Sequence, residues 1–498
     1  MKPADASDYV VGVAGCGAMG QGIAQVSVQG GMRTLLFDAR ESGADHAKEQ
    51  ISKRLMRLAE KGRMGEAEAQ AAADLLIPCG GIEDLGEADC IVEAVFEDLD
   101  VKHSLFGELE GVVRPDAILA SNTSSIPLAS IARVCEHRDR IAGLHFFNPV
   151  PLMKLVEVIR AAETSDETIA VLMDLGRRMT RTPVEVKDSP GFLVNMGGRA
   201  YTTEALRIVH EGVATPAQVD AIMRDCWGFR MGPFELMDLT GIDVNYPVSQ
   251  IVYNGYNQDP RIKTAANHMA MFDAGMFGRK TGRGWYRYED GQPLERPSPD
   301  FVTDAAPISK VRVAGPNPDL KAFCEHVGLS IGDDGPILAA PTGLDATSVI
   351  SQTGADPKHF MAIDLSGNIA KRVTVMTAPG ADRSALSGVA AAIAASGRPV
   401  SWISDSPGFV GPRMAAMVAN LGCYMAEIGL ASPEDIDTAM ELGLNYPRGS
   451  IALADVMGVE TCLATLNLLQ QITGEDRYRP TMWLKRRAML GLPIHTPN

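Results

Sequence analysis

From position 9 to position 187, short apolar runs alternate with stretches in which apolar residues have helical spacing. Residues 9–14 form a β-branched apolar run, and residues 23–28 continue with helical spacing. Residues 44–76 are rich in Ala, Lys, Glu and Leu, which predicts one or two helices. The other strand-like runs are residues 34–37, 90–95, 117–120, 141–147 and 155–159. Strands separated by helices predict a parallel, helix-covered sheet, so we expect an α/β domain over residues 1–187.

The pattern changes after residue 188. Residues 192–285 have long helical patterns with few strand candidates, which predicts an all-α domain over residues 188–290. Residues 291–306 are rich in proline and acidic residues, as is typical of a linker. Short strand-like runs then return at 311–313, 336–339, 360–364 and 372–376. We expect a shortened, degenerate α/β unit over residues 307–400.

An internal repeat relates the two halves of the chain. The pentapeptide Asp-Ser-Pro-Gly-Phe at 188–192 recurs at 405–409, an offset of 217, and the register continues without a gap to residues 243 and 460. The identical pairs include Asp220 with Asp437 and Gly232 with Gly449. A long identity with its register preserved indicates a duplication. Residues 401–498 are therefore expected to form a second copy of the all-α domain.

A glycine-rich turn follows the first apolar run. Residues 15–20 read Gly-Cys-Gly-Ala-Met-Gly, and a helical pattern and a second strand-like run come after them. In that context the three glycines allow a tight turn, the approach of a pyrophosphate to backbone N–H groups, and close helix packing. The sequence therefore predicts a Rossmann-like domain that binds a dinucleotide. The predicted contacts in this loop are Gly15, Gly17, Ala18, Met19 and Gly20.

The second strand-like run ends in an acidic residue, Asp38. At this place after the glycine turn, a carboxylate accepts hydrogen bonds from the adenosine ribose of a bound dinucleotide. The same charge repels a 2′-phosphate, which favours NAD over NADP. Arg40 is the neighbouring residue that would weaken this preference.

Composition and charge narrow the class of protein. The chain has 498 residues and a formal net charge of −16, which disfavours nucleic-acid and anionic-membrane partners. No apolar run reaches about 18 residues, and the acids near the N-terminus do not match a signal peptide. Eight scattered cysteines without a C-x-x-C pair predict reduced thiols and no metal site. We expect a cytoplasmic protein.

Two polar residues interrupt apolar strands. The run 141–147 contains His145, and Glu157 stands inside the apolar run 155–159. A buried, unpaired carboxylate is very costly, so a pair of Glu157 with His145 would satisfy both residues. In such a pair the carboxylate fixes the imidazole tautomer and stabilises its cation, as a general base requires. A purely structural His–Glu pair is the alternative.

The hydroxyl-rich segment 121–125 also follows a strand-like run. Such segments often cap helices, and Ser124 or Ser125 could do so here.

These motifs together resemble the L-3-hydroxyacyl-CoA dehydrogenases. The resemblance extends from Gly15 to Tyr286 and implies a dinucleotide-binding domain followed by a helical domain, with the substrate in the cleft between them. It makes His145 the general base and Glu157 its partner. Ser124 and Asn195 become polar contacts near the reacting oxygen and the nicotinamide. The matching segments are 15–20, 93–97, 121–125, 145–149, 153–159, 188–195, 232–235 and 278–286.

The resemblance also implies further binding residues. Lys61 matches a lysine near the coenzyme A phosphates, and Ser52 matches a second coenzyme A contact. By themselves, Lys61 and Lys102 are typical of solvated helix faces. The positions that match NAD contacts outside the glycine loop are Asp38, Glu97, Lys102, Asn148 and Lys280.

The second half departs from this pattern where chemistry would need it. The repeat register places Pro412 at the position of Asn195, and the strand 360–364 places Asp364 at the position of His145. No carboxylate equivalent to Glu157 is evident near 372–376. We therefore expect residues 307–498 to be noncatalytic. The long fused form resembles bacterial 3-hydroxyadipyl-CoA dehydrogenases of aromatic-acid breakdown.

The expected activity is reversible NAD-dependent oxidation of a 3-hydroxyacyl-CoA. One alternative is a dehydrogenase of a free hydroxy acid, as in the related gulonate dehydrogenases and lambda-crystallins. Another is a noncatalytic scaffold that binds NAD. The duplicated helical domains are expected to pack against each other as an intrachain pseudo-dimer, and further homo-oligomers remain open.

Overall fold

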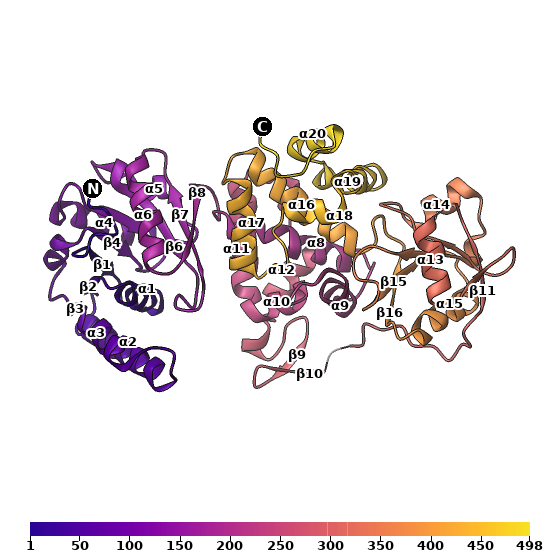
Figure 1. Ribbon diagram of the computed structural model, residues 1–498, viewed down its shortest axis with the longest axis horizontal. Coiled ribbons are helices and arrows are strands. Elements are labelled where there is room, and N and C mark those ends of the chain that lie inside the picture. Colours follow the sequence, from indigo (N-terminus) through magenta and orange to yellow (C-terminus); the bar gives the residue numbers. More distant parts are fainter. Residues whose placement is uncertain (296, 316) are drawn as a thin grey trace. The chain divides into compact units, whose positions relative to one another are not determined.

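The chain divides into two units, one of which includes a helix from far along the sequence. The computed structural model describes residues 1–295, 297–315 and 317–498 (Figure 1). Unit 1 comprises Met1–Met196 and Ile428–Leu444, and unit 2 comprises Gly197–Glu427 and Asn445–Asn498.

Unit 1 contains a sheet of eight strands in the order β3-β2-β1-β4-β5-β6-β7-β8. Neighbouring strands are parallel except β6 and β7, which are antiparallel. This sheet confirms the predicted α/β domain, although the sequence pattern did not reveal its two edge strands, β3 and β8. The strands are β1 (Val10–Ala14), β2 (Arg33–Phe37), β3 (Leu76–Pro78), β4 (Cys90–Glu93), β5 (Ile118–Ser121), β6 (Ile141–Phe146), β7 (Leu155–Arg160) and β8 (Thr182–Lys187).

Helices connect most of the strands of unit 1, and apolar residues from the helices and the strands form its core. Val11 and Val13 of β1 and Ile23 of α1 are fully buried in this core. A polar residue begins α4, where the Asp98 side chain accepts hydrogen bonds from two backbone N–H groups of the first turn. The helices are α1 (Ala18–Gln29), α2 (Gly43–Glu60), α3 (Glu66–Asp74), α4 (Leu99–Val112), α5 (Leu128–Ala132), α6 (Asp166–Arg178) and α7 (Val194–Gly197).

Helix α17 (Pro433–Leu444) joins unit 1 from the second half of the chain and packs on β7 and β8. The backbone N–H of Lys187 donates to the Leu430 carbonyl oxygen at 2.9 Å just before this helix. A Cβ added at Gly443 would lie 2.9 Å from Leu155 Cδ2 and 3.0 Å from a methyl carbon of Val194. Glycine at 443 therefore lets the helix approach the sheet closely.

Unit 2 contains both copies of the helical domain, apart from α17. Helix α8 packs against α16, and the buried side chains of Glu204 and Arg413 form an ion pair between them at 2.6 Å. The two copies therefore contact each other within one unit, as the duplication led us to expect. The helices are α8 (Arg199–His210), α9 (Pro216–Trp227), α10 (Pro233–Thr240), α11 (Ile242–Gly255), α12 (Ala266–Asp273), α16 (Gly411–Glu427), α18 (Ala452–Met457), α19 (Val459–Thr473) and α20 (Met482–Leu490).

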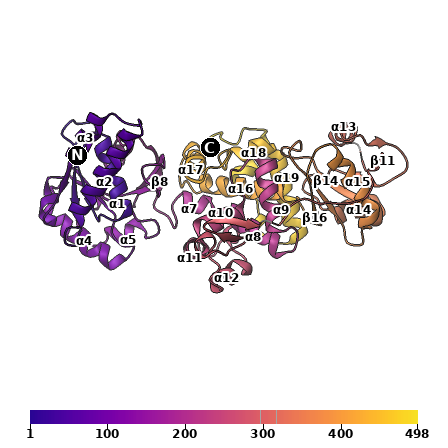
Figure 2. The same cartoon turned by 90° about the horizontal axis from the view of Figure 1, so that it is seen from below.

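A six-stranded sheet, ordered β12-β11-β13-β14-β15-β16, completes unit 2 (Figure 2). Its last four strands repeat the parallel, antiparallel, parallel pairing of β5 to β8. Strand β11 corresponds to β4 of the first sheet. On the side where β4 pairs with β1, β11 pairs with the two-residue strand β12, which ends the sheet. The described part of this domain therefore has no counterpart of β1, the glycine turn and α1, which makes it a shortened α/β unit. The strands are β11 (Lys310–Val313), β12 (Ser330–Ile331), β13 (Ile337–Ala339), β14 (Phe360–Asp364), β15 (Val373–Thr377) and β16 (Val400–Ser404), and the helices are α13 (Pro318–His326), α14 (Ala346–Thr353) and α15 (Arg383–Ala395).

The predicted linker begins with regular structure. Strands β9 (Arg287–Glu289) and β10 (Gln292–Glu295) form an antiparallel hairpin across the start of residues 291–306. Two residues lie outside the described part of the chain: Arg296 in the predicted linker, and Pro316 in the predicted α/β unit 307–400.

Candidate active site

The antiparallel pairing of β6 and β7 places His145 directly opposite Glu157. His145 Nδ1 lies 2.6 Å from Glu157 Oε2, and both side chains are buried, with that of Glu157 fully so. The structure thus brings together the two residues that the sequence analysis paired. Because Nδ1 faces the carboxylate, Nε2 is the ring nitrogen that remains for proton exchange.

A sharp turn supplies further partners to Glu157. Gly191 and Phe192 both have positive φ angles, of 76° and 50°, immediately before α7. The turn directs the backbone N–H groups of Leu193 and Val194 at Glu157 Oε1, at 3.1 and 2.8 Å. These two donors and the imidazole compensate the cost of burying the carboxylate.

Aromatic rings flank the imidazole. The Phe147 ring centroid lies 4.5 Å from that of His145, and the Phe192 centroid lies at 5.7 Å. The rings restrict the orientation of the imidazole, and the hydrogen bond to Glu157 fixes the ring nitrogen that faces inward.

Ser124 and Asn195 lie on the two segments next to this pair. Ser124 is exposed in the loop after β5, and Asn195 is partly exposed in α7, one residue after Val194. The Asn122 side chain accepts a hydrogen bond from the Phe146 backbone N–H at 2.8 Å, which ties the Ser124 loop to the His145 strand. The roles of both residues stay predictions.

The structure does not support a capping role for Ser124 or Ser125. Helix α5 begins after Pro127, and the Asp188 carboxylate accepts the hydrogen bond from the Ala129 backbone N–H at 2.9 Å. Proline fixes the backbone entry and a distant carboxylate takes the free N–H group, so the two serine hydroxyls are not needed there.

The glycines of the predicted dinucleotide loop differ in whether the surrounding protein leaves room for a side chain. Gly15 has a φ of 100°, and a Cβ on Gly20 would lie 1.8 Å from the Gly15 carbonyl oxygen, so the fold itself requires both. A Cβ on Gly17 would meet no atom within 4 Å among the described residues. Glycine at 17, at the N-terminus of α1, leaves room for a phosphate group at the backbone, as NAD binding requires.

Asp38 is joined to the glycine turn. Its Oδ2 accepts the Cys16 backbone N–H at 2.8 Å, and its Oδ1 accepts Arg40 Nε at 2.9 Å. The hydrogen bonds from Arg40 lower the pKa of Asp38 to about 2. Asp38 is therefore a carboxylate at neutral pH, although the exposed Arg40 offsets part of its charge.

Lys102 is buried, which contradicts its interpretation as part of a solvated helix face. Its side chain is 1% exposed and lies 2.7 Å from Glu93 Oε1 and 3.3 Å from Glu97 Oε2. Glu93 Oε2 also accepts a hydrogen bond from the Ser121 hydroxyl at 2.6 Å. The sequence analysis assigned no role to Glu93 or Ser121, although both belong to segments that match the family. The signal for Glu93 was an acidic residue inside the apolar run 90–95.

Glu97 binds the hydroxyl-rich loop 121–125 through several hydrogen bonds. Its Oε1 accepts hydrogen bonds from the Thr123 hydroxyl, the Ser124 N–H and the Ser125 hydroxyl at 2.7 to 3.0 Å. Burial alone would raise the pKa of Glu97, but these donors and Lys102 lower it below its usual value. The loop is therefore organised around a fixed negative charge.

The remaining predicted binding residues are spread along the chain. Asn148 is exposed after β6, Ser52 lies partly buried on α2, and Lys61 is exposed at the end of that helix. Lys280 belongs to unit 2, where its Nζ pairs with Asp243 Oδ2 at 2.6 Å. Their contacts with ligands stay predictions.

The second half carries different residues at the positions that correspond to His145 and Glu157. Strands β14 and β15 pair Asp364 with Thr374, in the register that pairs His145 with Glu157. Thr374 is buried and cannot act as the carboxylate partner of an imidazole.

In the residues that the structure describes, none of the eight cysteines forms a disulfide bond, and no group of three or more His, Cys, Asp or Glu side chains is placed to hold a metal ion. Within the same residues, no helix has both the length and the apolar character needed to cross a membrane.

The NAD-binding domain model of 3-hydroxyacyl-CoA dehydrogenases matches residues 10–189, and the model of their C-terminal domain matches residues 191–288 and 408–493. The chain therefore belongs to the 3-hydroxyacyl-CoA dehydrogenase family, whose members are NAD-dependent oxidoreductases. The two matches of the C-terminal model confirm the duplication of the helical domain.

Particular relatives cover different lengths of the chain. The 3-hydroxyadipyl-CoA dehydrogenase of Escherichia coli K12 is 35% identical over 96% of this chain and 97% of its own. A crystal structure of 3-hydroxybutyryl-CoA dehydrogenase from the same species covers 97% of this chain and 98% of its own, at 34% identity and a TM-score of 0.86. A probable 3-hydroxybutyryl-CoA dehydrogenase of Deinococcus radiodurans is 38% identical over 56% of this chain and 99% of its own.

Proposed function

We propose that this chain catalyses the reversible NAD-dependent oxidation of a (3S)-3-hydroxyacyl-CoA to the 3-oxoacyl-CoA, with His145 as the general base. The observation that carries the proposal is the buried contact of 2.6 Å between His145 Nδ1 and Glu157 Oε2, in the same sheet as the strand that leads into the dinucleotide loop. An imidazole can accept a proton near neutral pH and return it in the reverse direction.

The residues around His145 divide the remaining work. Glu157 holds Nδ1 and stabilises the imidazolium, so that Nε2 takes the proton of the substrate hydroxyl. NAD, when bound, supplies the hydride acceptor. Ser124 and Asn195 orient the reacting oxygen, and positioning of this kind lowers the barrier by fixing the geometry of reaction.

Binding of the two large ligands is proposed to use separate residues. Lys61 attracts the phosphates of coenzyme A, and Ser52 gives it a second polar contact. The proposed NAD contacts are Gly15, Gly17, Ala18, Met19, Gly20, Asp38, Glu97, Lys102, Asn148 and Lys280.

The substrate that we propose is a short acyl-CoA, 3-hydroxyadipyl-CoA or 3-hydroxybutyryl-CoA. The two Escherichia coli relatives that cover nearly the whole chain carry these two substrates in their names. Similarity over the second half supports the fused acyl-CoA dehydrogenases over the dehydrogenases of free hydroxy acids, whose resemblance is limited to the first α/β domain and the first helical domain.

We also propose that the second half is noncatalytic and serves as a built-in partner for the first. Each helical copy covers the other in unit 2, which supports an intrachain pseudo-dimer. Eight scattered cysteines without a C-x-x-C pair support a reducing location, the cytoplasm.

Oxidation of NADH in the presence of acetoacetyl-CoA tests the function. We expect turnover with acetoacetyl-CoA and none with free acetoacetate at the same concentration. Preference for the free acid would establish the hydroxy-acid alternative. NADH binding without turnover on any short 3-oxoacyl-CoA, the C4 and C6 compounds included, would establish the scaffold.

A further inference from the structure

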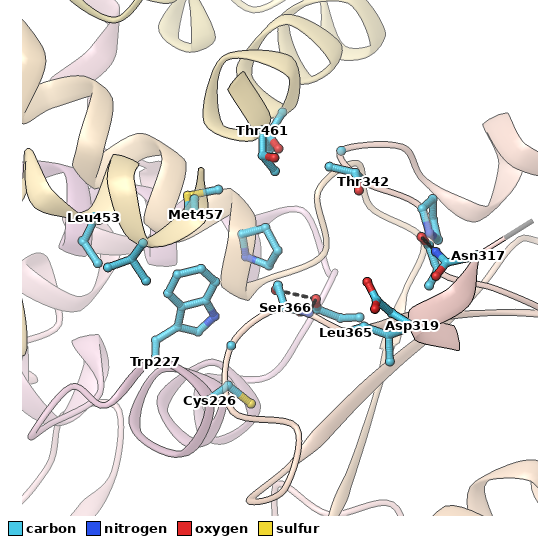
Figure 3. A pocket seen from close by; sticks show the side chains of 18 of the residues that line it. Cys226, Trp227, Asn317, Asp319, Thr342, Leu365, Ser366, Leu453, Met457 and Thr461 are labelled. Atoms are coloured by element: carbon cyan, nitrogen blue, oxygen red, sulfur yellow. Dashed lines mark hydrogen bonds between the residues drawn. The ribbon is translucent and has the colours of Figure 1, made fainter. Parts of the chain in front are cut away.

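Unit 2 has a cavity of about 360 Å³ between its sheet and its helices (Figure 3). One wall comes from the loops after β11, β13 and β14, and the other comes from the end of α9 and from α16, α18 and α19. The carboxyl ends of parallel strands are the usual place for a ligand in an open α/β sheet. The volume is within the range of small-molecule sites.

The cavity contains the second-half counterparts of catalytic positions. Asp364, at the position of His145, and Pro412, at the position of Asn195, both line it. The cavity therefore lies at the second-half positions that correspond to His145 and Asn195, where the side chains differ from those of the first half.

Two buried polar atoms on the helical wall lack a partner. Trp227 Nε1 and Thr465 Oγ1 have no hydrogen-bond partner among the described residues, and Thr465 is fully buried. Figure 3 shows the indole of Trp227 with its nitrogen on the cavity side. A buried donor without a partner costs free energy, which a ligand with acceptor oxygens would recover.

A cation stands at the same cavity. Arg448 lines it, is exposed, and has no ion-pair partner within the residues that the structure describes. The repeat register places Met231 at the corresponding position of the first half, so the charge is particular to this cavity. A guanidinium and an indole N–H are both donors, and together they suit a carboxylate.

Apolar side chains give the cavity its second character. Trp227, Leu453 and Met457 stand along the helical wall in Figure 3. These groups suit a hydrocarbon chain or ring rather than a second charged end.

The opposite wall excludes nucleotides. Asp364 and Asp319 lie there, and one Asp364 oxygen already accepts the Ser366 N–H and hydroxyl. Burial raises the pKa of Asp364 to about 6, so it is largely ionised at neutral pH. Two acids, without a glycine-rich phosphate loop, repel a polyphosphate.

We propose that this cavity is a second ligand site, which binds a small organic acid with an apolar body. Its carboxylate lies at Arg448 and the Trp227 indole N–H, and its hydrocarbon part lies along Leu453 and Met457. The site is independent of the dehydrogenase reaction and needs neither NAD nor coenzyme A.

Hexanoate, hexanamide and hexylammonium are matched probes for the test. They are titrated into the full chain labelled with ¹⁵N, and the resonances of the four tryptophan indoles are followed. The variant Trp227→Phe identifies the resonance of Trp227. We expect hexanoate at millimolar concentration to shift that resonance saturably, and hexanamide to bind about tenfold more weakly because it lacks the charge.

Substitution separates this site from any other place where hexanoate binds. Arg448→Met, which installs the residue found at the corresponding first-half position, should weaken hexanoate about tenfold. The exposed Arg486 lies outside the cavity lining, so Arg486→Met is the matched control and should leave hexanoate affinity unchanged. The proposal is overturned if hexanoate does not shift the Trp227 resonance. Tighter binding of hexylammonium, or hexanoate affinity unchanged by Arg448→Met, also overturns it.

Discussion

At the scale of residues, catalysis is proposed to depend on one imidazole and the carboxylate that holds it. We expect His145→Ala to lower kcat by about a hundredfold or more, since a general base contributes on that order, while the Kd for NADH stays unchanged. Steady-state turnover and calorimetric titration of NADH measure the two quantities. His137→Ala, an exposed histidine, is the control. A kcat near that of the unmodified chain would contradict the assignment.

A second residue-scale prediction concerns Asp38. Asp38→Ser removes the negative charge beside the glycine turn, so we expect the ratio of kcat/KM for NAD to that for NADP to fall by about tenfold or more. The pKa of Asp38 is lowered to about 2, so its charge persists until the pH falls to that range. The 2′-phosphate of NADP takes up its second proton near about pH 6, so in the unmodified chain the ratio should stay constant between about pH 7.5 and pH 9, where both charges are fixed. A variation that follows a titration in this interval would show that another group sets the preference.

The sequence predicted the His145–Glu157 pair because both residues interrupt apolar strands and a buried charge needs a partner. It did not predict that Lys102 is buried, because helical spacing alone does not show which helix face meets a neighbouring acid. Lys102 forms its ion pair with Glu93 at the end of β4, and Glu93 accepts a hydrogen bond from Ser121 at the end of β5. These residues come together only when β4 and β5 pair in the folded sheet.

At the scale of elements, the repeat predicted a second all-α domain but not where one of its helices packs. Helix α17 corresponds to α9 by the repeat register. Helix α17 packs on β8 of unit 1, whereas the α9 residue Gln218 donates to the Trp402 carbonyl oxygen of β16. An amphipathic pattern identifies the apolar face of a helix but not the sheet that the face covers, so this exchange could not be read from the sequence.

The close packing of α17 gives an element-scale prediction. In an exposed helix position, Gly→Ala stabilises a protein by about 0.5–1 kcal/mol. Gly107 in α4 is such a position, with nothing within 4 Å of an added Cβ, so Gly107→Ala should stabilise the chain. Gly443→Ala should destabilise it, because the new methyl group would crowd Leu155 and Val194.

Chemical denaturation of both variants measures the difference in sign. Val194 donates its N–H to Glu157, so we also expect Gly443→Ala to lower kcat. If both substitutions stabilise the chain, the contact between α17 and the sheet is not tight.

At the scale of the whole molecule, the two halves should differ in cofactor binding. The glycine turn and its helix belong to the first half, and the described part of the second α/β domain has no counterpart of them. We therefore expect one NAD per chain of 498 residues. Calorimetric titration gives the stoichiometry, and two equivalents per chain would show that the second domain has kept a site.

Truncation tests the role of the second half. A chain ending near residue 290 loses α16, which covers α8, and α17, which covers β8. We expect this fragment to dimerise, with α9 of each copy taking the place of α17 on the other, or else to aggregate. Light scattering after size exclusion distinguishes these states. A soluble, active monomer would contradict the proposed pseudo-dimer.

The ion pair between Glu204 and Arg413 shows what fusion permits. In the repeat register, Leu421 is the equivalent of Glu204, and Met196 is the equivalent of Arg413. Neither charge therefore has a charged equivalent in the other copy. In a homodimer, both sides of the interface have the same sequence, so a mutation that adds a charge adds it to both subunits. In a single chain that contains both copies, a substitution can change one side of the interface alone, and a second substitution on the other side can compensate for it. Fusion therefore allows the two copies of the helical domain to have different surfaces that are complementary to each other.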